Sequence, residues 1–174
     1  MRWNLSPRES GLLAAGVALV FDQATKIFML YGLGFIVKPS ESHVIGVLPF
    51  FNLVMVWNPG VSYGWFPAGG PEGTAVLALF SIVAVAALGW WLWIADRLSL
   101  TIGLGLVMGG ALGNLIDRLI YGKVADFFHF YGHGYDWYVF NVADAAITFG
   151  VIALLYDALL RPEAQAVGGK SQTE

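Results

Sequence analysis

Four long apolar stretches dominate the chain, over about 11–33, 74–95, 98–121 and 140–160. Each is long enough for a helix that crosses a bilayer, which takes about 20 residues. The second stretch contains no charged residue, and the other three are interrupted by a few polar side chains. The pattern predicts an all-α integral membrane protein built as a bundle of four transmembrane helices.

The segment between the first two stretches, about 34–73, has a different pattern. Its run 50–57 is rich in β-branched and aromatic residues, and Asn58-Pro59-Gly60 after it is typical of a turn. We expect a small β-containing element on the extracytoplasmic face, between the first and second helices. The tail 162–174 is polar with Pro and Gly, so we expect it to be disordered and 1–161 to form one four-span domain.

The N-terminus also has features of a cleavable signal peptide, because Arg2 and Arg8 flank the start of an apolar run. The apolar pattern continues past Lys26 to the length of a full span, with no convincing small-residue cleavage site. We therefore expect the first helix to be retained.

The distribution of cations orients the predicted bundle. An N-terminus inside the cell puts five cations in the cytoplasm (Arg2, Arg8, Arg97, Arg161, Lys170) and two outside (Lys38, Lys123). The positive-inside rule favours this orientation. Both termini are then cytoplasmic, and the segment 34–73 lies outside.

The composition is typical of a membrane protein and excludes several kinds of partner and catalytic group. Hydrophobic residues make up 57% of the chain and charged residues 12%, against roughly 25% charged in an average soluble domain. The net charge of −3 and the lack of a basic stripe argue against a nucleic-acid partner. The absence of cysteine excludes disulfides and cysteine nucleophiles.

The polar residues of the predicted spans converge at the outer end of the bundle. They are Asp22, Gln23 and Lys26 in the first span, Asn114, Asp117 and Arg118 in the third, Asp126 in the following loop, and Asn141 and Asp144 at the start of the fourth. Ionisable groups in a membrane are costly and usually face a bundle interior or a site. Their shared depth indicates one polar pocket.

Each of these groups also has a structural interpretation. Asp22 and Lys26 are four residues apart and could form an ion pair along one helix. Asn141 could cap the fourth helix, with Asp144 as the acid of its first turn. Asp126 could be a solvated loop residue. All of these would have to hold independently, so a shared site is the stronger interpretation.

The chemistry that such a pocket favours is that of paired carboxylates. Two acids in one site titrate as a coupled pair, so that one abstracts a proton from water while the other hydrogen-bonds the scissile carbonyl. Asp117, Asp126 and Asp144 are the three candidates, and spacing does not choose among them. Arg118 directly follows Asp117 and would keep it ionised, which suits a supporting role.

Other chemistry is weakly indicated. The sequence 60–64 matches G-x-S-x-G, but no alternating strand–helix pattern surrounds it. His129 and His133 are four apart, yet the glycines beside them argue against a metal-binding helix. Glycines at 105, 109 and 113 indicate close helix packing. A transporter would spread polar groups across the full depth of the membrane, and a scaffold would need no acids.

Five motifs in this order resemble the bacterial lipoprotein signal peptidases, also called signal peptidase II or prolipoprotein signal peptidase. They are the sequences at 22–26 (DQATK), 52 with 58–64 (N and NPGVSYG), 109–118 (GGALGNLIDR), 124–127 (VADF) and 140–144 (FNVAD). The resemblance extends from the first span to the end of the fourth.

The resemblance implies a function and roles for residues. Members of the family are aspartic endopeptidases of the bacterial cytoplasmic (inner) membrane. They remove signal peptides from prolipoproteins by cutting before a diacylglyceryl-modified cysteine near the outer face, and globomycin inhibits them. The implied catalytic residues are Asp126 and Asp144. Substrate-binding or supporting roles are implied for Asp22, Lys26, Asn52, Asn58, Gly60, Asn114, Asp117, Arg118 and Asn141. No metal or organic cofactor is implied, and we expect a monomer.

Overall fold

The computed structural model describes residues 5–36, 44–60 and 70–159. Its helices are α1 (Pro7–Ile27), continued by the π-helical turn η1 (Phe28–Gly32), α2 (Pro71–Ile94), α3 (Leu98–Tyr121) and α4 (Val142–Leu159). Its strands are β1 (Ile45–Leu48), β2 (Phe51–Asn58), β3 (Val124–Gly132) and β4 (Tyr135–Asp136). Four helices in these ranges are long and apolar enough to cross a membrane, which confirms the predicted fold class.

Helix α3 is the centre of the bundle and packs against α1, α4 and α2. Its glycines permit this close approach. A Cβ atom at Gly105 would lie 2.0 Å from the carbonyl oxygen of Gly11, and one at Gly109 would lie 2.4 Å from that of Ala15. The predicted packing role of this glycine repeat is confirmed.

Local sequence explains where the helices begin and end. Ser6 and Glu9 form a capping box at the start of α1, with hydrogen bonds of 2.7 Å and 3.3 Å between side chains and backbone amides. Gly122 ends α3 with a φ of +71°, which a side chain would disfavour. The outward faces of the helices expose large apolar residues such as Val20, Phe80 and Phe149, as expected for surfaces that face lipid.

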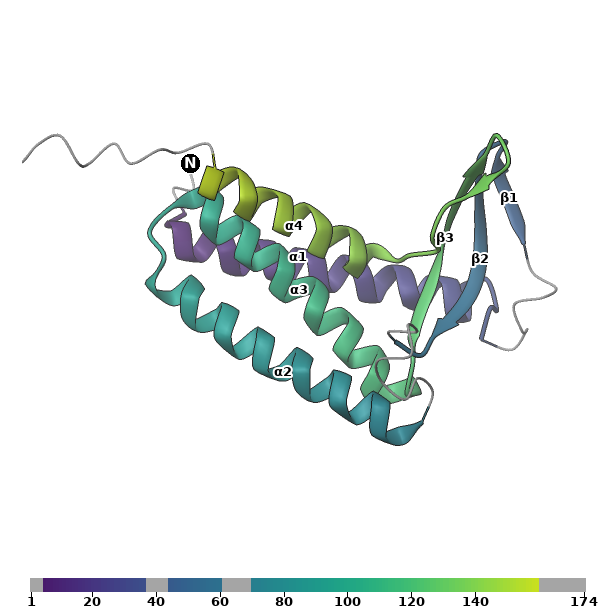
Figure 1. Cartoon of the computed structure of the whole chain (residues 1–174), viewed down its shortest axis with the longest axis horizontal. Helices are drawn as coiled ribbons and strands as arrows, with labels where there is room; N and C mark the ends of the chain where they lie inside the picture. Colours follow the sequence, from purple (N-terminus) through teal and green to yellow (C-terminus); the bar gives the residue numbers. More distant parts are fainter. Residues whose placement is uncertain (1–4, 37–43, 61–69, 160–174) are drawn as a thin grey trace, which may run out of the picture.

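The strands form one antiparallel sheet in the order β1-β2-β3-β4, at the end of the bundle opposite the start of α1 (Figure 1). Sequence analysis predicted β-structure between the first and second helices, where β1 and β2 lie. The prediction that Asp126 lies in a loop between the third and fourth spans was wrong, because Asp126 is on β3 and β4 follows it. The cause is non-local pairing: β3 pairs with β2, about 70 residues earlier, with Phe51 opposite Phe130 and Asn58 opposite Val124.

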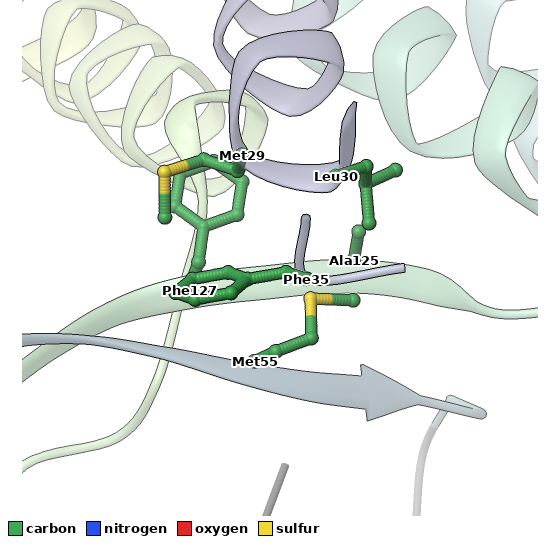
Figure 2. Close-up of a cluster of buried hydrophobic side chains, with 6 residues drawn as sticks. All are labelled: Met29, Leu30, Phe35, Met55, Ala125 and Phe127. Carbon is green, nitrogen blue, oxygen red and sulfur yellow. The ribbon is translucent and has the colours of Figure 1, made fainter. Parts of the chain in front are cut away.

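A buried apolar cluster joins the sheet to the bundle (Figure 2). Its members come from η1, the turn after it, β2 and β3: Met29, Leu30, Phe35, Met55, Ala125 and Phe127. Ala125 and Phe127 are fully buried. Because successive residues of a strand point to opposite faces, Asp126 between them points away from this cluster. Packing of its two neighbours therefore holds Asp126 in a fixed orientation.

Candidate active site

Asp126 is placed by β3 and is 1% exposed. Its two carboxylate oxygens accept from two amides. Asn58, at the end of β2, donates through Nδ2 to Oδ2 at 2.9 Å, and Asn141 donates through Nδ2 to Oδ1 at 2.6 Å. Both amides approach from neighbouring elements, so the position of Asp126 depends on the sheet and on the start of α4.

Asp144 is placed by the first turn of α4 and is only partly buried. Asn141 caps this helix: its Oδ1 accepts from the backbone amide of Asp144 at 2.9 Å, and its own backbone amide donates to Oδ2 of Asp144 at 3.2 Å. The other carboxylate oxygen accepts from Nδ2 of Asn114 at 2.9 Å. The capping role predicted for Asn141 is confirmed, and it coexists with a role in the site.

Asn141 therefore joins the two acids. Its side-chain nitrogen bonds Asp126, while its backbone amide and its side-chain oxygen bond Asp144. Asp117, the third acid, has no hydrogen bond to Asn141 among the described residues; its Oδ2 accepts from Lys26 and from the backbone amide of Ala125. Asn141 thus hydrogen-bonds Asp126 and Asp144 but not Asp117.

The environment of Asp126 favours its protonated form. Burial, and after it the negative charge of nearby Asp144, raise the pKa of Asp126 to about 7 against the opposing effect of hydrogen bonds from Asn58 and Asn141. Near neutral pH one acid of the pair can thus hold a proton. This is the charge state that general acid–base chemistry with two carboxylates requires.

A buried ion cluster lies directly behind the acid pair. The ammonium group of Lys26 lies 2.9 Å from Oδ2 of Asp22 and 2.8 Å from Oδ2 of Asp117. The predicted pairing of Asp22 with Lys26 along one helix is confirmed, but it is part of a larger network. Asp22 also accepts from the backbone amide of Ala143 at 2.9 Å, and Asp117 accepts from that of Ala125 at 3.1 Å. The cluster thereby ties α1 and α3 to the backbone next to each acid.

Two open pockets lie near the site, and one of them is lined by an acid of the pair. One, of about 570 Å³, is lined by Asp144 with aromatic and apolar residues of 137–149, among them Trp137, Tyr138 and Phe149. The other, of about 480 Å³, lies between α2 and α3 and is lined by Arg118. A mostly apolar pocket that opens on a carboxylate suits a substrate with a large apolar part.

Two further residues named in the sequence analysis lie on β2 and just after it. Gly60 donates its backbone amide to Oδ1 of Asn58 at 2.9 Å and has a φ of +110°. Because a backbone amide only donates, it fixes the Asn58 amide with the nitrogen toward Asp126. Asn52 lies opposite His129 in the sheet, six residues before Asn58 and about 20 Å away along the strand. The structure does not bring Asn52 to the acids.

Sequence analysis missed other contributors to the site. Tyr138 had no assigned chemical role, yet its hydroxyl accepts from Nδ2 of Asn58 at 2.9 Å. Gly113 was assigned to packing alone, yet a Cβ atom there would lie 2.3 Å from Oδ2 of Asp22. Its position next to Asn114 was the available signal. Outside the site, Asp157, which is buried at the far end of the bundle beside Arg97, was also overlooked.

The histidine pair lies on β3 and in the turn after it, whereas the serine of the G-x-S-x-G match lies outside the described residues. His129 lies on β3 with Nε2 3.5 Å from Oδ1 of Asp136, and His133 lies in the turn before β4. The predicted absence of a helix there is confirmed. In the described ranges no group of three or more His, Asp or Glu side chains could hold a metal. Ser62 of the G-x-S-x-G match and the tail 162–174 lie outside the described residues.

Comparison with known proteins adds independent evidence. The family model described as signal peptidase (SPase) II matches residues 14–160. The chain is 49% identical to a protein named lipoprotein signal peptidase from Rhodopseudomonas palustris (strain TIE-1), over 90% of this chain and 95% of that one. It is 47% identical to a protein of the same name from Nitrobacter hamburgensis, over 93% and 99% of the two chains.

Solved structures resemble the fold as well. A bacterial membrane enzyme determined by the in meso method at 2.3 Å resolution superposes with a TM-score of 0.73 at 28% identity, over 93% of this chain and 94% of that one. The match to the family model runs from within α1 to the end of α4 and includes both acids. The chain is a multi-pass membrane protein that belongs to the signal peptidase II family of peptidases.

Proposed function

We propose that the chain is an aspartic endopeptidase that removes signal peptides from prolipoproteins, cutting before the diacylglyceryl-modified cysteine. The observation that carries this proposal is the pair Asp126 and Asp144, joined by Asn141 at the sheet end of a membrane bundle. The name lipoprotein signal peptidase, carried by relatives that are 47–49% identical, supports the substrate class.

In this mechanism Asp144 is the general base and Asp126 the general acid. The Asp144 carboxylate takes a proton from a water molecule whose oxygen attacks the scissile carbonyl carbon. Protonated Asp126 donates to the carbonyl oxygen, so that a neutral tetrahedral intermediate forms. The carbon–nitrogen bond then breaks as Asp144 gives its proton to the leaving amine of the modified cysteine. Asp126 takes a proton back from the new carboxyl group, and the pair returns to its starting state.

The pKa of Asp126 supports this assignment. A value of about 7, raised by burial and then by the charge of Asp144, leaves Asp126 substantially protonated at neutral pH. Asp144 is the more accessible of the two and lines the larger pocket, where water and substrate can reach it. Asn141 limits the relative movement of the two carboxylates.

The substrate reaches the acids from the membrane. The pocket beside Asp144 borders exposed apolar residues of α4, including Phe149, so a lipid-modified segment can enter sideways from the bilayer. We place this end at the outer face of the bacterial cytoplasmic membrane, with both termini in the cytoplasm. Arg97, in the turn between α2 and α3 at the other end, is then cytoplasmic, as the positive-inside rule favours. We expect a monomer that globomycin inhibits.

The test is cleavage of a lipidated prolipoprotein by the purified protein in detergent, with and without globomycin. Asp126→Asn and Asp144→Asn should each reduce kcat by at least about 1,000-fold. Asp117→Asn tests whether the third acid is needed for catalysis, and this variant should retain more activity than Asp126→Asn or Asp144→Asn. Asp157→Asn is the matched control for Asp126→Asn, because Asp157 is also buried but lies at the opposite end of the bundle. Substantial cleavage by a folded Asp126→Asn or Asp144→Asn protein would refute the assignment.

A further inference from the structure

The ammonium group of Lys26 has a donor for each of three acceptors. It bonds Asp22 at 2.9 Å, Asp117 at 2.8 Å and Oδ1 of Asn114 at 3.2 Å. Lys26 is 2% exposed, so water does not compete for these bonds. An ammonium group has three N–H donors and no acceptor. All three are engaged, and the group cannot turn without breaking a bond to a buried carboxylate.

The contact with Asn114 has a directional consequence. Because Lys26 only donates, the atom of the Asn114 amide that faces it must be the oxygen. The amide is planar, so its nitrogen is then directed to the other side, where it donates to Oδ1 of Asp144 at 2.9 Å. If the amide were reversed, its oxygen would face the carboxylate and its nitrogen the ammonium. Both of those contacts would be repulsive.

A second donor, the side-chain amide of Asn141, approaches the same oxygen but fixes the orientation of the Asn114 amide less strongly. Nδ2 of Asn141 lies 3.2 Å from Oδ1 of Asn114, and the same nitrogen also reaches Oδ1 of Asp126 at 2.6 Å and the carbonyl oxygen of Ala125 at 3.3 Å. Its two hydrogens are therefore shared among three acceptors. A bond from a charged donor is also stronger than one from a neutral amide. Lys26 is the group that sets the Asn114 amide.

We propose that Lys26 is a positioning residue that acts through Asn114: it holds the Asn114 amide with its nitrogen toward Asp144, and so keeps that carboxylate in place to take a proton from water. This inference rests on the proposed function of the acid pair. It gives Lys26, which lies in the first span and lines neither pocket beside the acids, a defined effect on catalysis. Lys26 affects turnover, and substrate binding does not depend on it.

The test is a double-mutant cycle on cleavage of a lipidated prolipoprotein. Asn114→Leu removes the donor to Asp144 and should lower kcat about 100-fold, as loss of one well-placed donor does. Lys26→Met should lower kcat roughly tenfold or more, with KM unchanged. Because the two residues act in series, the double variant should fall within about twofold of Asn114→Leu alone. A purely structural Lys26 would instead give effects on kcat that multiply.

Lys26→Met leaves the buried carboxylates of Asp22 and Asp117 without their cation, which destabilises the fold. The same cycle is therefore repeated in an Asp22→Asn background. There the two substitutions together remove one positive and one negative charge, so the net charge of the cluster is unchanged. Multiplying effects in the folded variants, or a folded Lys26→Met protein with more than half of the wild-type kcat, would overturn the inference.

A spectroscopic measurement separates this inference from the proposed function. The ¹⁵N resonance of the Asn114 side-chain amide, assigned by its loss in Asn114→Leu, should be a single resonance that carries two protons in the labelled wild type. It should shift or double in Lys26→Met. An unchanged signal would refute the role of Lys26 even if the wild type cleaves its substrate. Failure of the wild type to cleave, with the signal shifted as expected, would refute only the proposed function.

Discussion

The side-chain nitrogen of Asn141 lies 2.6 Å from Oδ1 of Asp126, and both residues are almost completely buried. Asp126 comes from a strand and Asn141 from the cap of a transmembrane helix, and the same asparagine bonds Asp144 through its backbone amide and side-chain oxygen. One residue thus sets the start of α4 and the spacing of the two acids.

Replacing Asn141 should therefore affect both activity and stability. We expect Asn141→Ala to lower kcat about 100-fold, because the Asp126 carboxylate loses its donor at 2.6 Å and the backbone amide of Asp144 loses its acceptor. The loss of the helix cap should lower the free energy of unfolding by about 1 kcal/mol. Cleavage assays and thermal unfolding in detergent measure the two effects. Val142→Ala, the neighbouring substitution, should leave kcat within a few-fold, and a similar kcat for the two variants would contradict this account.

The pH dependence should report the proton on Asp126. Burial and the charge of Asp144 raise the pKa of Asp126 to about 7, and the mechanism needs this group protonated. Activity should then fall as pH rises through about 7, because Asp126 loses its proton. The bond from Asn58 lowers the pKa of Asp126, so Asn58→Leu should move the alkaline limb of the kcat profile to higher pH. A limb that stays in place, or moves to lower pH, would contradict the assignment.

Gly113 should tolerate no side chain. A Cβ atom there would lie 2.3 Å from Oδ2 of Asp22, which is held by Lys26 and cannot move without breaking the ion cluster. We expect Gly113→Ala to reduce kcat at least tenfold and to lower the unfolding temperature. Gly16→Ala is the matched control, because nothing lies within 4 Å of a Cβ atom at that position of α1. That variant should be stabilised by about 0.5–1 kcal/mol.

Asp157 should contribute to stability and not to turnover. It is buried at the far end of the bundle, where Arg97 lies 2.7 Å and the hydroxyl of Ser99 2.5 Å from its carboxylate. The Arg97 side chain is 45% exposed, so solvent weakens the pair. We expect Asp157→Asn to lower the free energy of unfolding by about 1–2 kcal/mol. A loss of kcat in the folded variant would show that the two ends of the bundle are coupled.

Some contacts of the site were predictable because they are local in sequence. The ion pair of Asp22 with Lys26 and the cap of Asn141 on α4 connect residues three or four apart, where helix geometry dictates the contact. The candidate acids were also found from their cost in a membrane. The role of Tyr138 was not predictable, because its hydroxyl bonds Asn58, which is 80 residues away.

The sequence by itself determined four membrane spans, because their length and apolar composition match the thickness of a bilayer whatever the tertiary structure. It also determined that a small set of polar residues shares one depth. Only the tertiary structure decided that β3 joins the sheet, that Asp126 and Asp144 meet on Asn141, and that Asp117 faces Lys26 instead. These relationships join elements far apart in the chain. They depend on strand register and on which helices pack against one another, and a local pattern such as the glycine repeat does not specify the partner.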